Sequence, residues 1–144
     1  KGNGVINRIF HSFGKYTGDL EGRRNGALIS MASGKAVAFA IFNLQARGEM
    51  FVTHNDPVYE GMIVGLSSKS GDLEINVMKG KQLTNMRTQG TDENVVLTPV
   101  RAMSIAEQLS MLNTDEALEI TPKSLRLRKS MLNPHDRKRK SKAS

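Results

Sequence analysis

Short apolar segments separated by turn-forming residues fill the middle of this sequence and limit the folds that it can adopt. Between residues 50 and 78, the segments MFVTH, MIVGLSS and DLEINVM are separated by NDPVYEG and KSG. The apolar segments have the length of β-strands, and the Asp, Pro and Gly residues between them supply turn geometry. The pattern predicts several short strands joined by turns.

Further strands are expected on both sides of this region. The segments KGNGVINRIFHSF and ALISMAS precede it, and VVL, ALEIT and SLRLR follow it. Each is short, and each is either apolar or alternates between apolar and polar residues, as strands do. In SLRLR the two leucines alternate with Arg126 and Arg128, so the period of two directs both arginines to the face opposite the core.

Two internal helices are expected from spacing and capping. Residues 36–47 carry apolar side chains at helical spacing and end on Gly48, a residue type favoured just beyond a helix C-terminus. Ser104 and Glu107 form the capping-box pattern S-x-x-E, in which each side chain bonds the backbone N–H of the other residue. They predict a helix over residues 104–112.

These elements predict a fold of the α+β class that is mostly antiparallel β and barrel-like, with two or three short helices and one long functional loop. The 144 residues suit one domain, because a chain of this length can bury about 70% of the surface that its unfolded form exposes. The absence of cysteine excludes disulfides, thiolate catalysis and Cys-ligated metal sites. No apolar run approaches the roughly 20 residues of a membrane-spanning helix, so no membrane partner is expected.

Positive charge is concentrated at the C-terminal end. Residues 123–144 hold nine basic residues and one acid, a formal charge of +8; since the whole chain carries +7, the first 122 residues carry −1. Asn133 and Pro134 have the character of an N-cap and a first-turn proline for a last helix. A basic segment on a near-neutral body is typical of a protein that binds nucleic acid, although a solvated tail has the same composition.

The sequence contains few arrangements of residues that could support catalysis. The three histidines are far apart in sequence, and no pair has the spacing of metal ligands. Asp92 and Glu93 lie in no apolar context that would raise the pKa of either carboxyl. The Gly-Lys pairs at residues 34–35 and 80–81 lack the hydroxyl residue and the upstream glycine of a phosphate-binding P-loop. We expect no enzyme activity, metal or cofactor in this chain.

The segment from Lys79 to Asn94 is the strongest candidate for a functional loop. Its sixteen residues have little apolar periodicity, and loops longer than about 12–15 residues are uncommon in compact domains unless they have a function. Lys79, Lys81 and Arg87 suit phosphate contacts, and Asn85 suits a base edge or a ribose. No aromatic residue lies in the loop, so backbone and groove contacts are expected rather than base stacking. An ordinary flexible insertion would have similar features.

Several segments together resemble one protein family. GRRNGALIS, KAVAFAIFNLQARGEMFV, VYEGMIVG and above all GKQLTNMRTQGTDE are similar to the C-terminal domain of the BipA/TypA family of translational GTPases. The resemblance extends from Gly4 to Arg139. In addition, KGNGVINRIFHSFGKY resembles the last strand of the elongation-factor-G-like domain V that precedes this domain in the family.

The resemblance implies three segments and a role on the ribosome. Residues 1–17 would end the preceding domain, residues 18–132 would form the BipA/TypA C-terminal domain, and residues 133–144 would form a basic tail. Family members are ribosome-binding GTPases with roles in large-subunit assembly and in growth at low temperature or under stress. Their GTPase domain, which uses GTP and magnesium, would lie outside this chain.

The resemblance also implies which residues contact RNA. A long loop of the family reaches toward the peptidyl-transferase region and the acceptor end of the A-site tRNA, and it corresponds here to residues 78–94. An RNA-contact role follows for Lys79, Lys81, Asn85 and Arg87. The remaining candidates are basic residues of a family motif near the start of the domain and of the C-terminal region, namely Arg23, Arg24, Arg126, Arg128, Lys129, Arg137, Lys138, Arg139 and Lys140.

We therefore expect a cytoplasmic, monomeric accessory domain that binds large-subunit rRNA and tRNA and has no chemistry of its own. Two alternatives stay open. The loop and tail could bind acidic ribosomal or stress-response proteins, in which case binding would survive nuclease treatment. A small hydrolase that uses Asp92 or Glu93 is the other alternative, and it would require a turnover that Asp92→Asn abolishes.

Overall fold

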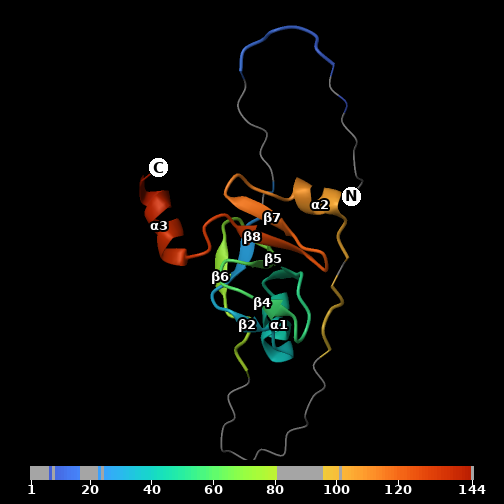
Figure 1. The fold of residues 1–144 in the computed structure, drawn as a ribbon, viewed down its shortest axis with the longest axis vertical. Helices are drawn as coiled ribbons and strands as arrows, with labels where there is room; N and C mark the ends of the chain where they lie inside the picture. Colours follow the sequence, from blue (N-terminus) through green and yellow to red (C-terminus); the bar gives the residue numbers. More distant parts are fainter. Residues whose placement is uncertain are drawn as a thin grey trace, which may run out of the picture.

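The structure, a computed structural model, describes residues 7, 9–16, 23, 25–80, 96–100 and 102–143. Within these ranges, eight strands and three helices form an α+β fold (Figure 1). In chain order the elements are β1 (Ala27–Ser30), β2 (Gly34–Lys35), α1 (Ala38–Gln45), β3 (Gly48–Met50), β4 (Pro57–Val58), β5 (Ile63–Ser67), β6 (Leu73–Ile75), α2 (Ile105–Ser110), β7 (Glu116–Ile120), β8 (Leu125–Lys129) and α3 (Pro134–Ala143).

The largest sheet has four strands in the order β3, β5, β1, β6. Strand β1 pairs with β5 in antiparallel orientation and with β6 in parallel orientation. All four residues of β1 are buried, as expected for a strand covered on both faces. Strands β3 and β6 form the edges of this sheet, so no closed barrel is found among the described residues. The α+β class and the mostly antiparallel pairing are confirmed, whereas the barrel-like closure is not.

Two smaller sheets complete the fold. Strand β2 pairs with β4, and β7 pairs with β8 in an antiparallel hairpin that sets Glu116 opposite Lys129. A bridge between Met62 and Arg128 joins this hairpin to the beginning of β5. The hairpin is thereby held against the four-stranded sheet.

The four-stranded sheet is covered on both faces. Leu28 of β1 and Val64 of β5 belong to one apolar cluster, to which α1 contributes Ile41. Ile29 of β1 belongs to a second cluster, to which β8 contributes Leu127. Because side chains alternate along a strand, neighbouring residues of β1 serve the two clusters. The sheet therefore lies between α1 on one side and the hairpin β7–β8 on the other (Figure 1).

Helices α2 and α3 begin where capping residues predict. The Ser104 Oγ accepts a hydrogen bond from Glu107 N at 3.3 Å, and Glu107 Oε2 accepts one from Ser104 N at 2.8 Å. At the start of α3, the Asn133 Oδ1 accepts a hydrogen bond from the backbone N of His135 at 2.8 Å. The capping box and the Asn-Pro start are both confirmed.

Some expected strands differ in the structure. Residues 9–16 form no strand, and Ile9, Phe10 and Phe13 are exposed. A strand needs a partner strand to bond its backbone groups, and none of the described strands pairs with this segment. Residues 96–100 form no strand either. The strand expected over residues 50–54 ends at residue 50, and residues 57–58, which are expected in a turn, form β4.

Candidate nucleic-acid interface

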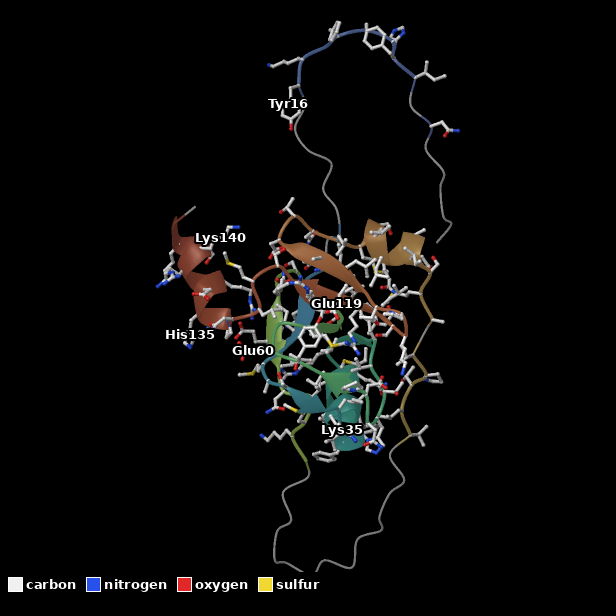
Figure 2. All side chains as sticks on the ribbon, in the orientation of Figure 1. Tyr16, Lys35, Glu60, Glu119, His135 and Lys140 are labelled. Carbon is white, nitrogen blue, oxygen red and sulfur yellow. The ribbon has the colours of Figure 1, made fainter. Side chains whose placement is uncertain are left out.

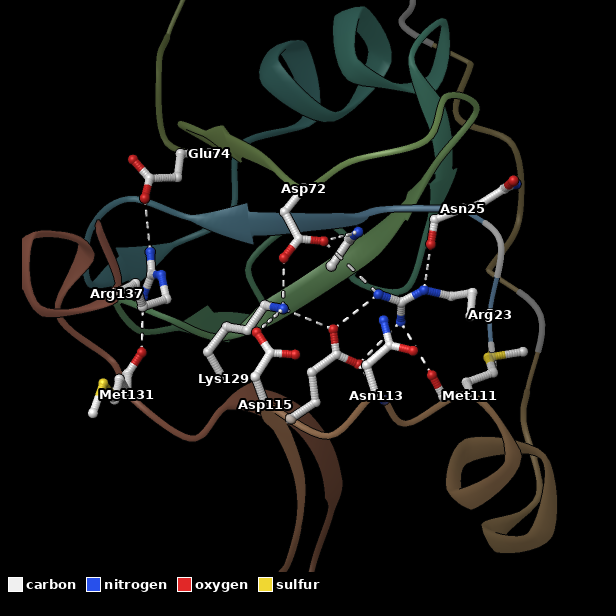
Figure 3. A network of polar contacts seen from close by, with 12 residues as sticks. Arg23, Asn25, Asp72, Glu74, Met111, Asn113, Asp115, Lys129, Met131 and Arg137 are labelled. Carbon is white, nitrogen blue, oxygen red and sulfur yellow. Dashed lines mark hydrogen bonds and ion pairs between the residues drawn. The ribbon is translucent and has the colours of Figure 1, made fainter. Parts of the chain in front are cut away.

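Helix α3 stands beside the sheet and carries five basic residues and one acid (Figure 1, Figure 2). One of these, Arg137, connects the helix to the body of the domain (Figure 3). Its Nη2 lies 2.8 Å from Oε1 of Glu74 on β6, and its Nη1 donates to the carbonyl oxygens of Met131, at 3.0 Å, and Leu132. Arg137 therefore fixes α3 to the edge strand.

Four other side chains of α3 are exposed to solvent, and one of them, Lys138, also borders the groove between α3 and the sheet. His135, Lys138, Arg139 and Lys142 are exposed, and their spacing of i, i+3, i+4 and i+7 sets them on one face. We name these four residues the outer face of α3. Arg139 also pairs with Asp136 at 3.2 Å, but both side chains are more than half exposed, so water and salt screen this pair. The outer face offers three cations to a polyanion.

Lys129 is withdrawn from solvent. Its side chain is 2% exposed, and its Nζ lies 2.5 Å from Asp72 Oδ2, 2.7 Å from Asp115 Oδ2 and 3.0 Å from Glu116 Oε1 (Figure 3). Burial alone would lower the pKa of Lys129, but the hydrogen bonds to the three carboxylates outweigh it and raise that pKa. The charge is neutralised inside the protein, so Lys129 offers none to RNA in this structure.

Arg23 belongs to the same network. Its side chain is 6% exposed, and its two terminal nitrogens donate to the two carboxylate oxygens of Glu116 at 2.8 and 3.2 Å. Asp72 lies 3.9 Å from Arg23 Nη2. The network joins the segment before β1, the residue before β6 and the hairpin β7–β8 (Figure 3). Arg23 therefore has a structural role.

Asp72 connects this network to the central strand. Its Oδ1 accepts a hydrogen bond from the backbone N of Ala27, the first residue of β1, at 2.7 Å. Burial would raise the pKa of Asp72, but the hydrogen bonds from Ala27 and Lys129, together with the charges of Lys129 and Arg23, lower it below its ordinary value. Asp72 is thus held as a carboxylate at the junction of β1 and β6.

The alternation expected in β8 is confirmed. Leu127 is buried in the core, whereas Arg126 and Arg128 are half-buried on the opposite face. Arg126 Nη1 lies 3.6 Å from Oε1 of Glu119 on the neighbouring strand. The Tyr59 hydroxyl donates to the other oxygen of Glu119 at 2.5 Å, and burial together with this bond raises the pKa of Tyr59 to about 12. Both arginines keep part of their surface in solvent.

Lys79 is exposed where the described chain ends after β6, and it lines a groove that also contains Arg47. Sequence reasoning missed Arg47, because nothing in the spacing of Arg47 and Lys79 indicates that both line one groove.

Lys140 lines a groove beside Met131. The other candidates, Arg24, Lys81, Asn85 and Arg87, lie outside the described residues, as do Asp92 and Glu93.

Two other kinds of site are absent from the part of the chain that the structure describes. No group of three or more His, Cys, Asp or Glu residues there could hold a metal ion. No helix there is long and apolar enough to cross a membrane.

Comparison with known proteins shows where such a domain occurs. A model of the TypA/BipA C-terminal domain matches residues 25–134. A Buchnera aphidicola (subsp. Schizaphis graminum) protein called "Large ribosomal subunit assembly factor BipA" is 50% identical over 139 residues, which are 96% of this chain and 23% of that protein. Proteins of the same name from Escherichia coli (strain K12) and Salmonella typhimurium are 46% and 47% identical, over 99% and 96% of this chain and 24% and 23% of their own lengths. The chain spans about a quarter of the length of these relatives.

Proposed function

Because this chain belongs to the TypA/BipA C-terminal domain family, we propose that it is the ribosome-binding module of a large-subunit assembly factor. Relatives that share about half of its residues bear the name of such a factor. The family match covers a C-terminal domain alone, so we assign binding to this chain, and GTP and magnesium to a GTPase domain that it does not include. In finer terms, the module acts as a monomer, contacts large-subunit rRNA and the acceptor end of the A-site tRNA, and serves growth at low temperature or under stress.

The observation that carries the proposal is the division of the cations into two groups. Arg23, Lys129 and Arg137 pair with carboxylates inside the fold or at its edge. The outer face of α3, by contrast, presents its charges to solvent. Cations of the second kind gain affinity for RNA because they displace counterions condensed on the phosphates. Helix α3 is therefore one RNA contact of the module.

The test is sedimentation of the chain with purified large ribosomal subunits over a range of salt concentrations. In the variant Lys138→Ala/Arg139→Ala/Lys142→Ala, affinity should fall, and the slope of log affinity against log salt should become shallower by about 0.7–0.9 for each phosphate that the variant no longer neutralises. A matched control removes three other exposed lysines, as Lys35→Ala/Lys69→Ala/Lys123→Ala, and should bind as the unaltered chain does.

The outcomes separate RNA binding from protein binding. Loss of binding after nuclease treatment of the subunits supports an RNA contact, whereas binding that survives it supports a module for acidic proteins. Equal decreases in the variant and in its control would show that only net charge matters, which would overturn the assignment to α3. The loop is a second part of the proposal, and Lys79→Ala/Lys81→Ala/Arg87→Ala should weaken binding in the same assay.

A further inference from the structure

A groove of about 400 Å³ lies between α1 and the chain segment formed by β6 and the residues that follow it. Ligand pockets have volumes of about 300–1,000 Å³, so the groove is large enough for a small ligand. From the α1 side, Phe39, Asn43 and Arg47 line it at spacings of four residues, which sets them along one side of the helix and its C-terminal end. From the other side, Glu74, Asn76 and Lys79 line it.

The groove is positively charged despite the presence of Glu74. Arg47 and Lys79 are exposed, and neither has an ion pair with a residue that the structure describes. The carboxylate of Glu74 is neutralised by Arg137, whose Nη2 lies 2.8 Å away (Figure 3). The pair that fixes α3 to β6 therefore also removes the one negative charge in the lining, which leaves Arg47 and Lys79 to attract an anion.

A larger groove, of about 580 Å³ between α3 and the sheet, has the opposite character. Asp72, Glu74 and Asp115 line it together with Arg137 and Lys138, and each carboxylate is paired with Lys129 or Arg137. Three acids and two cations line this groove, whereas one acid and two cations line the groove beside α1. Of the two grooves, the one beside α1 is the better site for a phosphate.

Two amides in the groove beside α1 keep hydrogen-bonding capacity. The Asn43 Nδ2 donates to the Phe39 carbonyl oxygen at 2.9 Å, which leaves the Asn43 Oδ1 as an acceptor. The Asn76 Oδ1 accepts from Met78 N at 2.9 Å, which leaves the Asn76 Nδ2 as a donor. An acceptor, a donor, an aromatic side chain and two cations are the groups that recognise the edge, face and phosphate of a nucleotide.

We propose that this groove binds one nucleotide of single-stranded RNA, with its phosphate at Arg47 and Lys79 and its base at Asn43, Asn76 and Phe39. The proposal deepens the proposed function and rests on it. It also changes the expected mode of recognition: the loop after Lys79 has no aromatic residue, but α1 supplies Phe39 beside the point where that loop begins.

The test uses a fluorescein-labelled tetranucleotide of adenosine and fluorescence anisotropy at low salt. Asn76→Asp keeps the acceptor for Met78 N but replaces the free donor with a negative charge, and it should weaken binding at least about fivefold. Asn55→Asp makes the same change of charge in an exposed turn outside the groove lining and should leave affinity unchanged. Arg47→Ala/Lys79→Ala should reduce the salt slope by about 0.7, since both cations are assigned to one phosphate and each phosphate contact of a single strand contributes about 0.7. Its matched control is Lys35→Ala/Lys69→Ala.

The same variants are then sedimented with large ribosomal subunits, which separates this proposal from the one on which it rests. Suppose that the unaltered chain binds subunits, and that the groove variants have the same affinity for the tetranucleotide as the unaltered chain. That result overturns the groove proposal alone. If the unaltered chain binds no subunits, the proposed function is overturned. Weaker tetranucleotide binding in both groove variants, with unchanged controls and unchanged thermal unfolding, supports the groove.

Discussion

The Nζ of Lys129 lies 3.0 Å from Oε1 of Glu116, the residue opposite it in the hairpin β7–β8. The two side chains are 2% and 0% exposed, so this pair of charges is almost completely removed from water. Arg23, Asp72 and Asp115 complete the cluster, and its two cations and three carboxylates give it a formal charge of −1. Removal of either cation would leave three carboxylates around a single cation, a formal charge of −2.

Lys129→Met should therefore destabilise the domain strongly. Breaking a buried ion pair by removing one partner typically costs about 3–5 kcal/mol, and because Glu116 keeps Arg23 as a partner here we expect the lower end, about 3 kcal/mol. The measurement is the free energy of unfolding in urea at neutral pH. Lys123→Met, at an exposed position, is the control and should change that free energy by no more than about 0.5 kcal/mol. Similar values for the two variants would contradict the structural role of Lys129.

Acid should weaken the fold through Asp72. Its pKa is lower in the folded protein than the value of about 3.9 expected in the unfolded chain, so its contribution to stability is present above that value and is lost as the pH falls through the folded pKa. The free energy of unfolding should decrease below about pH 4. In Asp72→Asn this decrease should be smaller, and stability at neutral pH lower. Parallel pH profiles of the two proteins would exclude Asp72 as a source of the acid dependence.

Gly26→Ala should disrupt the start of β1. A Cβ at this position would lie 1.7 Å from the carbonyl oxygen of Gly71, and Gly26 is held there by backbone hydrogen bonds to Lys69 and Ser67. Because the obstacle is backbone rather than a flexible side chain, we expect a decrease of at least about 2 kcal/mol in the free energy of unfolding, measured by heat or urea. Gly14→Ala has nothing within 4 Å of the new Cβ and should leave stability unchanged.

Asn133→Ala should loosen α3 without unfolding the domain. Loss of an N-cap costs about 1 kcal/mol, and here the cost falls on a helix at the end of the chain. Hydrogen exchange should become faster in α3 but not in β1, and binding to ribosomal subunits should weaken. Asn133→Asp retains a capping oxygen and should restore both properties. Unchanged exchange in α3 of the alanine variant would show that the cap does not hold the helix.

Local signals in the sequence are enough to locate several elements. The S-x-x-E pattern at Ser104 and the Asn-Pro pair at Asn133 act through their own neighbours in the chain, so they predict the starts of α2 and α3. Alternation predicts the faces of Arg126 and Arg128. The same alternation, extended to residue 129, places Lys129 on the core face with Leu127. In the sequence, however, the positive charge of Lys129 suggests an RNA-contact role.

The contacts that sequence reasoning missed depend on topology. The groove beside α1 brings Arg47 and Lys79 together only because β6 returns parallel to β1, and no local pattern indicates that pairing. Arg137 lies in a basic run, and only the position of Glu74 on the edge strand shows that its charge is used within the fold. Similarly, β4 has two residues and its pairing with β2 is all that makes it a strand.

The parallel pairing of β1 with β6 also bears on the order in which the domain folds. Leu28 and its partner Leu73 are 45 positions apart in the chain, whereas Met50 and its partner Gly65 in the β3–β5 pair are 15 apart. Closing the longer interval costs more chain entropy before any contact offsets it, so we expect the β3–β5 pair to form before β6 joins β1. As an edge strand, like β3, β6 has a single neighbour in this sheet, and we expect it to open at a lower cost than β1 or β5. One wall of the groove beside α1 would then adjust to a ligand more readily than the centre of the sheet.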